Sequence, residues 1–333
     1  MSLAPLVVVT GATGFIGRHL LPALRSAGYR VRALVGPGRS LASEGVEVRP
    51  VASLTEAGAL TPLLDGAAAV LHFAGRAHRL RDMAADPAEA FRAANVAPTE
   101  ALAVAARAAG VRQFVFASSL SVVGPTSDVA LTAESPTRPA TPYGRSKLEA
   151  EQRLHALAAG GSMAVAVLRL PMVYGPGMRG NPLRLFRLVA RGWPVPFGAV
   201  RNRRSQLYVG ELARVLVAVL ARAPVAGTFY AADAEDLSTP EFTRRAARAL
   251  GVTPRMLPVP PVLFRAAGAL GSLLPAAIPF PRSREAAIGP TCSLFVDTTA
   301  RQAASGWRPQ PTVDAAFATT AQWVRAAWRE GGA

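Results

Sequence analysis

The stretch LVVVTGATGFIG, residues 6–17, decides the fold class of this 333-residue chain. Residues 6–10 form a mainly apolar run, which predicts a strand buried on both faces of a sheet. Glycines follow at 11, 14 and 17, and residues 14–28 have the pattern of a helix that ends near Gly28. A strand, a glycine-rich turn and a helix in this order predict a unit that binds a dinucleotide.

Each glycine of this turn has a predicted role. Gly11 permits the tight turn, Gly14 lets the backbone approach a pyrophosphate, and Gly17 lets the helix pack closely on the strand. The helix N-terminus adds N–H donors and the positive end of the helix dipole. The spacing Gly-x-x-Gly-x-x-Gly is one residue longer than the Gly-x-Gly-x-x-Gly fingerprint, but the physical requirements are the same.

Strand and helix patterns continue to alternate through residue 170. This alternation predicts an α/β fold with a doubly wound parallel sheet, the Rossmann arrangement, over residues 1–170. The further strand candidates are residues 29–35, 68–75, 112–119 and 163–171, and the helix candidates are 88–109 and 143–159.

The pattern loosens after residue 171. A short strand at 227–232 is expected to return to the sheet, so that a segment near 227–237 belongs to the first domain. We therefore predict that residues 171–333 form mainly a smaller α/β substrate-binding domain that is interwoven with the first. The helices expected there are 182–191, 209–222, 239–250, 260–274 and 312–329.

Composition excludes several classes of protein. The formal net charge is +16, but no five-residue run of arginine occurs, so we predict no nucleic-acid partner. Cys292 is the only cysteine and the four histidines are scattered, which predicts a reducing, cytoplasmic location and no metal site. The most apolar stretch, residues 257–280, contains Arg265 and five prolines, so we predict no membrane span.

The end of the second strand bears on the choice of cofactor. An acidic residue at this point binds the ribose 2′-hydroxyl of NAD. Here the sequence is VGPGRS, residues 35–40, which contains no acid. Arg39, or Arg32, could instead meet a 2′-phosphate, and the alternative is that Arg39 is a solvated loop residue. The cofactor is predicted to be NAD or NADP, with a slight preference for NADP.

Lys147 is the only lysine among 37 basic residues, and it lies four residues after Tyr143. On a helix this spacing places both side chains on one face. A phenol has a pKa of about 10 and is a poor base at neutral pH. A neighbouring ammonium favours the phenolate, and the compact lysine group can also bind a cofactor ribose where a planar guanidinium would not fit. We predict that Tyr143 and Lys147 form a catalytic pair.

Three serines lie in the segment SSLS, residues 118–121, directly after a predicted buried strand. Ligands of open parallel sheets bind at the carboxyl ends of the strands. A hydroxyl here could hold the substrate oxygen that Tyr143 protonates or deprotonates. The alternative is a serine-rich loop without chemistry, because loops favour serine.

These motifs together resemble the extended short-chain dehydrogenase/reductase family. They occur in that family's order and cover nearly the whole chain. Within the family the chain looks most like the NAD(P)-dependent nucleotide-sugar epimerases and 4-ketosugar reductases. The motifs are TGATGFIG (10–17), HFAG (72–75), Asn95 in AANV, SSLSVVGP (118–125), YGRSK (143–147), RLPMVYGPG (169–177) and RRSQLYV (203–209).

The resemblance implies a role for individual residues. Tyr143 would be the general acid/base, Lys147 its modulator, Ser119 the catalytic serine and Asn95 the structural fourth member. A homodimer formed through the helices at 88–109 and 143–159 is also implied. The implied cofactor contacts are Gly11, Thr13, Gly14, Phe15, Ile16, Gly17, Arg39, Ala74, Gly75, Tyr143 and Lys147, and the implied substrate contacts are Ser119, Ser121, Asn181 and Arg204.

Departures from the family pattern narrow the reaction. Family dehydratases follow the catalytic hydroxyl residue with an Asp-Glu pair, and Leu120 and Ser121 stand there instead. We therefore predict an NAD(P)-dependent epimerase or ketoreductase that acts on a nucleotide-diphosphate sugar at C4. The alternatives are a reductase or dehydrogenase of a non-sugar carbonyl or alcohol, of the aldehyde, flavonoid or steroid type, and a non-catalytic dinucleotide-binding regulatory protein.

Overall fold

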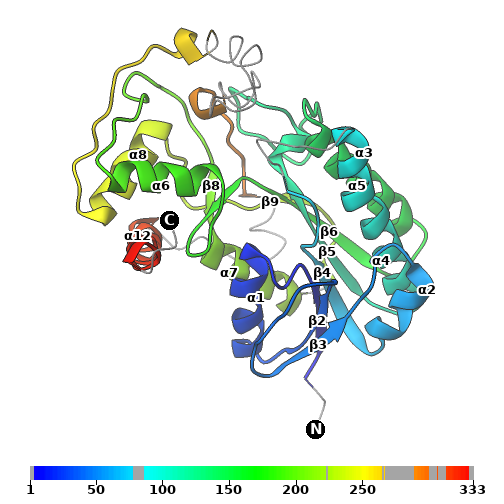
Figure 1. Cartoon of the computed structure of the whole chain (residues 1–333). Helices are drawn as coiled ribbons and strands as arrows, with labels where there is room; N and C mark the ends of the chain where they lie inside the picture. Colours follow the sequence, from blue (N-terminus) through cyan, green and yellow to red (C-terminus); the bar gives the residue numbers. More distant parts are fainter. Residues whose placement is uncertain are drawn as a thin grey trace.

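The computed structural model describes residues 4–77, 86–222, 224–264, 266, 289–299, 306 and 313–329 (Figure 1). Its centre is a seven-stranded parallel sheet in the order β3-β2-β1-β4-β5-β6-β9, which confirms the predicted doubly wound α/β fold. The strands are β1 (Leu6–Thr10), β2 (Arg30–Val35), β3 (Val46–Pro50), β4 (Ala67–His72), β5 (Gln113–Ser119), β6 (Ala164–Leu170) and β9 (Gly227–Tyr230).

The strand order reverses between β1 and β4. The chain runs outward from β1 through β2 to β3 and then returns to add β4 on the other side of β1. Ligands of doubly wound sheets bind outside the carboxyl ends of the strands at such a switch point. The glycine-rich turn follows β1 and residues 73–76 follow β4, so both loops lie at this crevice.

Helices cover both faces of the sheet (Figure 1). One face packs on α1 (Phe15–Ser26) and α7 (Val209–Ala221), and the other packs on α2 (Ala57–Leu60), α4 (Ala97–Ala108) and α5 (Pro142–Ala158). Because the sheet is covered twice, its central strands are buried and mainly apolar; all five residues of β1 are buried.

The single helix predicted at 88–109 is two helices. Helix α3 (Pro87–Asn95) ends and α4 begins at Ala97, with Pro98 in the first turn of α4. Proline lacks the N–H needed inside a helix and disfavours helical geometry at the residue before it. Pro98 therefore starts a new helix, while Asp86 caps α3 by accepting bonds from the N–H groups of Ala88 and Glu89.

A second cluster of helices stands beside the sheet (Figure 1). It consists of α6 (Asn181–Ala190), α8 (Thr239–Leu250) and α12 (Val313–Arg329), with the short parallel pair β7 (Met172–Tyr174) and β8 (Gln206–Tyr208). Four aromatic rings form its core: Tyr174, Phe186, Phe242 and Phe317.

Some expectations differ from the structure. The sequence patterns missed β3, because as an edge strand it is polar and largely exposed. The predicted helix at 260–274 and the apolar stretch 257–280 lie largely outside the described residues.

Strand β9 pairs with β6, as expected of a returning segment, and α7 packs on the same sheet. In the part of the chain that the structure describes, no helix is long and apolar enough to cross a membrane.

Candidate active site

The glycine-rich turn after β1 has room only for glycine at two positions. Gly11 has φ +72°, and a Cβ there would lie 2.5 Å from the carbonyl carbon of Phe73. A Cβ at Gly17 would lie 2.4 Å from the Gly11 carbonyl oxygen. Gly11 thus allows the turn and its contact with the loop after β4, and Gly17 allows α1 to pack against the turn. Both observations agree with the predicted roles of these two glycines.

The turn has the features that a dinucleotide pyrophosphate requires. The first backbone N–H groups of a helix have no partner within the helix, and α1 begins at Phe15, directly after Gly14. The N–H groups of Phe15, Ile16 and Gly17, with Thr13 just before them, therefore present donors and a positive dipole end at the crevice. The residues present fit a dinucleotide cofactor.

The arginines near the end of β2 have different surroundings. Arg39 is exposed in the loop after β2, which leaves it accessible to a ligand. Arg32 instead donates to Glu47 at 3.0 Å and to the carbonyl oxygens of Leu63 and Asp65. Arg32 thus holds the edge of the sheet together, and of the two arginines considered for a 2′-phosphate only Arg39 remains.

Helix α5 carries Tyr143 and Lys147. Its cap is Thr141, whose hydroxyl accepts a hydrogen bond from the Gly144 N–H at 3.0 Å, and Pro142 follows at the first helical position. Lys147 is 7% exposed, and its Nζ donates to the carbonyl oxygen of Ala117 at 2.9 Å. Because an ammonium has three donors, others remain for a ligand. A Cβ at Gly75 would lie 3.7 Å from this Nζ, so the lysine reaches the cofactor loop.

Tyr143 meets the serine segment at the carboxyl end of β5. Burial raises the pKa of the Tyr143 phenol, and a hydrogen bond with the Ser119 side chain partly offsets this effect. The Ser119 hydroxyl also donates to Ser121 Oγ at 3.2 Å. The fold thus brings Tyr143 of α5 to Ser119 and Ser121, which follow one another at the end of β5.

Burial also changes the pKa of Lys147, on the same helix. Desolvation lowers the pKa of Lys147 to about 8, and the negative charge of Glu151 acts in the opposite direction. The Nζ atom lies 4.5 Å from the centroid of the Phe116 ring, an arrangement that favours the ammonium form. In the absence of a cofactor the pair therefore holds a protonated phenol beside a lysine that can titrate close to physiological pH.

Asn95 fixes the loop after β4. It is 1% exposed; its Oδ1 accepts the Arg76 N–H at 2.8 Å, and its Nδ2 donates to the Arg76 carbonyl at 3.2 Å and to Ser146 Oγ at 3.0 Å. These bonds link α3, α5 and the loop that contains Ala74 and Gly75. The position agrees with a structural role for Asn95 at the site.

His72 was not predicted to take part, yet it lies at the centre of this arrangement. Its Nδ1 is 2.6 Å from Thr10 Oγ1 and its Nε2 is 2.9 Å from Thr99 Oγ1. Thr99 donates its only hydroxyl proton to the Asn95 carbonyl at 2.6 Å, so it must accept from His72 Nε2. His72 Nδ1 therefore accepts from Thr10, whose oxygen accepts the Ala74 N–H at 3.2 Å.

This directional chain has two consequences. It defines the neutral Nε2–H tautomer of His72, and burial, helped by the charge of Lys147, lowers the pKa of His72 to about 3. It also ties Ala74 to Asn95 through three side chains. The signal in the sequence was a histidine at the end of a buried strand, but its partners Thr10 and Thr99 come from two other elements.

A buried ion pair anchors α5 one turn beyond Lys147. Glu151 is 1% exposed and accepts from Arg169 Nη2 at 2.7 Å and from Arg169 Nε at 3.2 Å. Ser118 also donates to Glu151, and Arg169 donates to the Tyr230 hydroxyl at 3.2 Å. The pair joins α5 to β5, β6 and β9 beside the candidate catalytic residues.

Two of the implied substrate contacts, Asn181 and Arg204, have unequal surroundings. Asn181 is the first residue of α6 and is exposed. Arg204 is directed at the chain itself: its Nη1 donates to the carbonyl oxygens of Gly289 and Cys292, and burial lowers its pKa. In this structure Arg204 joins two segments of the second half, and Asn202 reinforces that junction by donating to the carbonyl oxygens of Pro290 and Cys292.

Comparison with known proteins gives a consistent result. The sequence profile of the NAD dependent epimerase/dehydratase family matches residues 7–231. A UDP-glucose 4-epimerase of Vibrio cholerae is 34% identical over 323 residues, which are 95% of this chain and 94% of that protein. A ceramide reductase of Caulobacter vibrioides is 34% identical over 79% of this chain and 76% of its own length. The solved structure of MoeE5 in complex with UDP-glucose and NAD has a TM-score of 0.74 and 28% identity, covering 97% of this chain and 99% of that one.

Proposed function

The chain belongs to the NAD dependent epimerase/dehydratase family of extended short-chain dehydrogenases/reductases, and from that premise we propose that it is an NAD(P)-dependent epimerase or ketoreductase acting on C4 of a nucleotide-diphosphate sugar. The observation that carries the proposal is the placement of Ser119 at the carboxyl end of β5, where its side chain interacts with the buried Tyr143 phenol, together with Lys147 reaching the cofactor loop. The full-length similarity to a UDP-glucose 4-epimerase and to the UDP-glucose complex of MoeE5 supports the substrate class.

In the proposed reaction the chain positions one oxygen and moves one proton. Ser119 orients the C4 oxygen, and Tyr143 gives a proton to it or takes a proton from it. Gly11, Gly14 and Gly17, the first N–H groups of α1 and Lys147 would hold the cofactor, which supplies hydride transfer when bound. Because burial keeps the Tyr143 proton in place, the free protein is set up as a proton donor. In the proposed reaction a protonated Lys147, one helical turn away, would favour the phenolate after transfer.

The surroundings of Ser119 argue against dehydration. Removal of water from a sugar needs an acid and a base next to the catalytic hydroxyl. Leu120 is buried and Ser121 carries a hydroxyl that bonds to Ser119. Neither side chain can serve as a general acid or base at neutral pH, so the proposed chemistry is confined to one carbon.

A second candidate is reduction of a carbonyl that is not part of a sugar. The ceramide reductase has the same 34% identity as the epimerase, although it covers less of the chain. Such substrates lack the diphosphate, and Arg204 is bonded to the chain itself. If no sugar nucleotide stabilises the protein against heat while NAD or NADP does, this candidate replaces the first.

The test compares wild type and Tyr143→Phe. UDP-glucose and UDP-galactose are supplied with NAD or NADP, and interconversion and binding are measured separately. We expect the variant to keep its affinity for nucleotide sugar and to lose at least about 100-fold in turnover, because only proton transfer is removed. Turnover that survives the substitution would reject the role of Tyr143.

A further inference from the structure

The outer edge of the second cluster of helices exposes apolar side chains. Seven large hydrophobic side chains are exposed among the residues that the structure describes, and four of them lie in residues 191–201 and 251–264. These two segments, the apolar edge, contribute Trp193 (59% exposed), Leu257 (49%), Val262 (64%) and Leu263 (54%). Single exposed hydrophobic residues are ordinary, but a group of them on one surface marks a site that contacts another molecule.

The two segments of the apolar edge lie side by side. The Val195 N–H donates to the Arg255 carbonyl oxygen at 2.8 Å, and the Leu257 N–H donates to the Val195 carbonyl oxygen at 2.9 Å. The rings of Phe197 and Phe264 stack with their centroids 5.9 Å apart. Figure 1 shows the segment after α8, in yellow, on the side of these helices that faces away from the central sheet. The exposed side chains of both segments therefore belong to one continuous surface.

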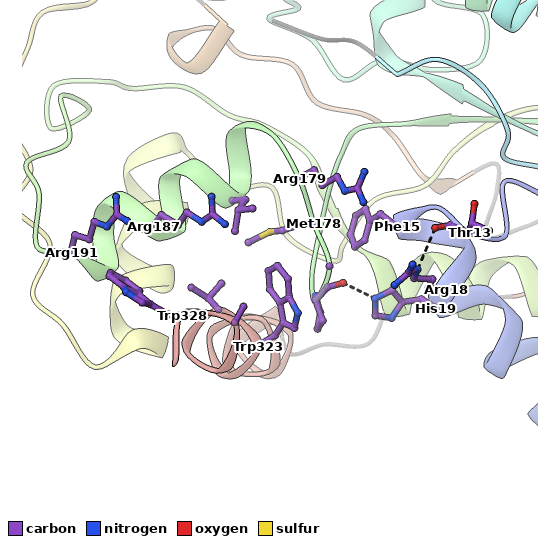
Figure 2. A pocket seen from close by; sticks show the side chains of 15 residues that line it. Thr13, Phe15, Arg18, His19, Met178, Arg179, Arg187, Arg191, Trp323 and Trp328 are labelled. Carbon is purple, nitrogen blue, oxygen red and sulfur yellow. Dashed lines mark hydrogen bonds between the residues drawn. The ribbon is translucent and has the colours of Figure 1, made fainter. Parts of the chain in front are cut away.

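The charge of the apolar edge is positive. Neither segment contains an acidic residue, and Arg201 and Arg255 are exposed. These two arginines form no ion pair within the described part of the chain. Arg191, at the end of α6, lies over the Trp328 ring of α12, 5.3 Å from its centroid, so a further arginine and a second tryptophan border the edge (Figure 2). The apolar side chains are thus accompanied by charges that attract an anionic surface.

The backbone between residues 257 and 263 has few donors that need water. The N–H groups of Leu257, Val259 and Leu263 donate to carbonyl oxygens of the chain itself. Residues 258, 260 and 261 are prolines, which have no N–H. An unpaired N–H is costly in an apolar medium. A segment whose donors are bonded or missing can therefore enter such a medium at low cost.

We propose that the apolar edge binds the surface of a membrane that contains anionic phospholipid. Trp193, Val262 and Leu263 enter the boundary between the head groups and the acyl chains, where tryptophan is favoured. Arg201 and Arg255 contact the phosphates. Apolar insertion and charge attraction are each weak alone, and together they give stable but reversible binding. The inference requires no helix that spans the membrane, and it does not depend on the reaction proposed for Tyr143.

A membrane surface fits this edge better than a second copy of the chain does. Two copies joined through the same surface would bring their arginines together, and no acidic residue of the two segments would compensate the repulsion. A membrane is extended and flat, so it can cover an outer edge that runs past the ends of α6 and α8 (Figure 1).

The experiment mixes the full chain with vesicles of phosphatidylcholine alone or with about 40% phosphatidylglycerol, and measures binding by co-sedimentation. We expect at least about tenfold tighter binding to the anionic vesicles, and weaker binding when NaCl is raised from about 0.1 M to about 1 M. Brominated phosphatidylcholine, added to the anionic vesicles, should quench tryptophan fluorescence more in wild type than in Trp193→Phe. Failure to bind the anionic vesicles, or equal quenching of the two proteins, would overturn the proposal.

Matched variants identify the surface. W193S/L263S removes two exposed apolar side chains from the apolar edge, and V48S/V129S removes two exposed ones elsewhere. The first should weaken vesicle binding at least about tenfold because less apolar surface is inserted, and the second should bind as wild type does. If W193S/L263S binds vesicles as wild type does, this edge is not the membrane contact.

Charge is tested in the same way. R201Q/R255Q removes two arginines of the apolar edge, and R30Q/R112Q removes two exposed arginines at the amino ends of β2 and β5. The first should weaken binding at least about tenfold, and the second should change it by less than about twofold. Equal weakening in both would mean that the vesicles respond only to the net charge of +16, and the proposal would fail.

A measurement without vesicles separates the membrane from a second copy. Sedimentation velocity of wild type and W193S/L263S should give the same oligomeric state. If the variant forms a smaller species than wild type, the apolar edge joins two copies of the chain, and the membrane proposal is wrong.

Discussion

Two clusters of buried ionisable side chains differ in how their charges are paired. The α5 cluster consists of Lys147, Glu151 and Arg169, and both carboxylate oxygens of Glu151 accept hydrogen bonds from Arg169. The α7 cluster consists of Tyr174, Glu211 and Asp233. There, Glu211 Oε1 forms an ion pair with Arg214, whose side chain is about half exposed, and Asp233 Oδ1 accepts the Tyr208 N–H at 2.9 Å. Asp233 Oδ2 and Glu211 Oε2 have no hydrogen-bond partner with good geometry among the described residues.

The difference shows that burial alone does not determine the state of a charge. In the α5 cluster a cation and an anion are buried together beside the candidate catalytic residues. In the α7 cluster burial, with a smaller contribution from the charge of Glu211, raises the pKa of Asp233 to about 7. The first cluster contains a buried ion pair. The second contains a carboxyl group, Asp233, that takes up a proton readily and so becomes neutral.

The largest expected effect comes from breaking the paired cluster. Glu151→Gln keeps the shape of the side chain but leaves Arg169 as a buried charge without its partner. We expect the free energy of unfolding to fall by about 3–5 kcal/mol, measured by urea denaturation at pH 7. Loss of the Glu151 charge should also lower the pKa of Lys147 further below about 8 and shift the alkaline limb of the activity profile to lower pH.

A neighbouring glutamate provides the control. Glu149 on the same helix pairs with Arg92 at 3.0 Å, but that arginine side chain is 55% exposed. Glu149→Gln should change stability by no more than about 1 kcal/mol, because exposed ion pairs contribute little. A Glu151→Gln loss as small as that of Glu149→Gln would show that the buried pair is not what holds α5 in place.

The second prediction concerns Asp233, which forms no ion pair among the described residues of the α7 cluster. Between pH 4 and 7 the folded protein keeps a proton on Asp233 that the unfolded chain has released, so this group reduces stability as the pH rises. Asp233→Asn keeps an acceptor for the Tyr208 N–H and removes the charge. We expect the variant to be more stable than wild type by about 2–4 kcal/mol at pH 8 and to match it near pH 4.

Asp128→Asn, at an exposed position, should stay within about 0.5 kcal/mol of wild type across the same range. Thermal unfolding followed at both pH values is sufficient for the comparison. An Asp233→Asn variant that is destabilised equally at pH 4 and pH 8 would show that the carboxylate is needed as an acceptor, and that burial of its charge has no measurable effect.

Local sequence patterns predicted one cluster in part and the other not at all. Tyr143 and Lys147 are four residues apart on one helix, so their placement on one face of α5 follows from helix geometry alone. Glu151 continues the same stripe, but its partner Arg169 comes from β6, and no local pattern indicates that contact. In the α7 cluster, Tyr174, Glu211 and Asp233 come from three separate segments, and only the tertiary structure brings them together.

The same distinction holds for the fold and the rest of the site. The buried strands and the glycine turn were predictable because their signals are continuous in sequence, whereas β3 was missed because an edge strand lacks the apolar signal. Arg204 was assigned by resemblance to the phosphates or base of the substrate. Its bonds to the Gly289 and Cys292 carbonyl oxygens depend on a segment more than 80 residues away. His72 needed knowledge of strand order, since β1 and β4 are neighbours only in the sheet.

The smallest expected effect tests whether burial keeps the His72 imidazole neutral. Its folded pKa of about 3 lies below the ordinary value of 6.5, so the unfolded chain binds a proton at pH 5 that the folded protein does not. Wild-type stability should therefore fall by about 2 kcal/mol between pH 7 and pH 5 from this group alone.

His72→Gln should reduce this dependence of stability on pH. Thr99→Val breaks the hydrogen-bond chain but keeps the imidazole, so it should lower stability at both pH values and leave the pH dependence unchanged. If the pH slope of His72→Gln equals that of wild type, as the slope of Thr99→Val is expected to, then burial does not hold the imidazole neutral. The tautomer derived from the chain of hydroxyl groups would then be wrong.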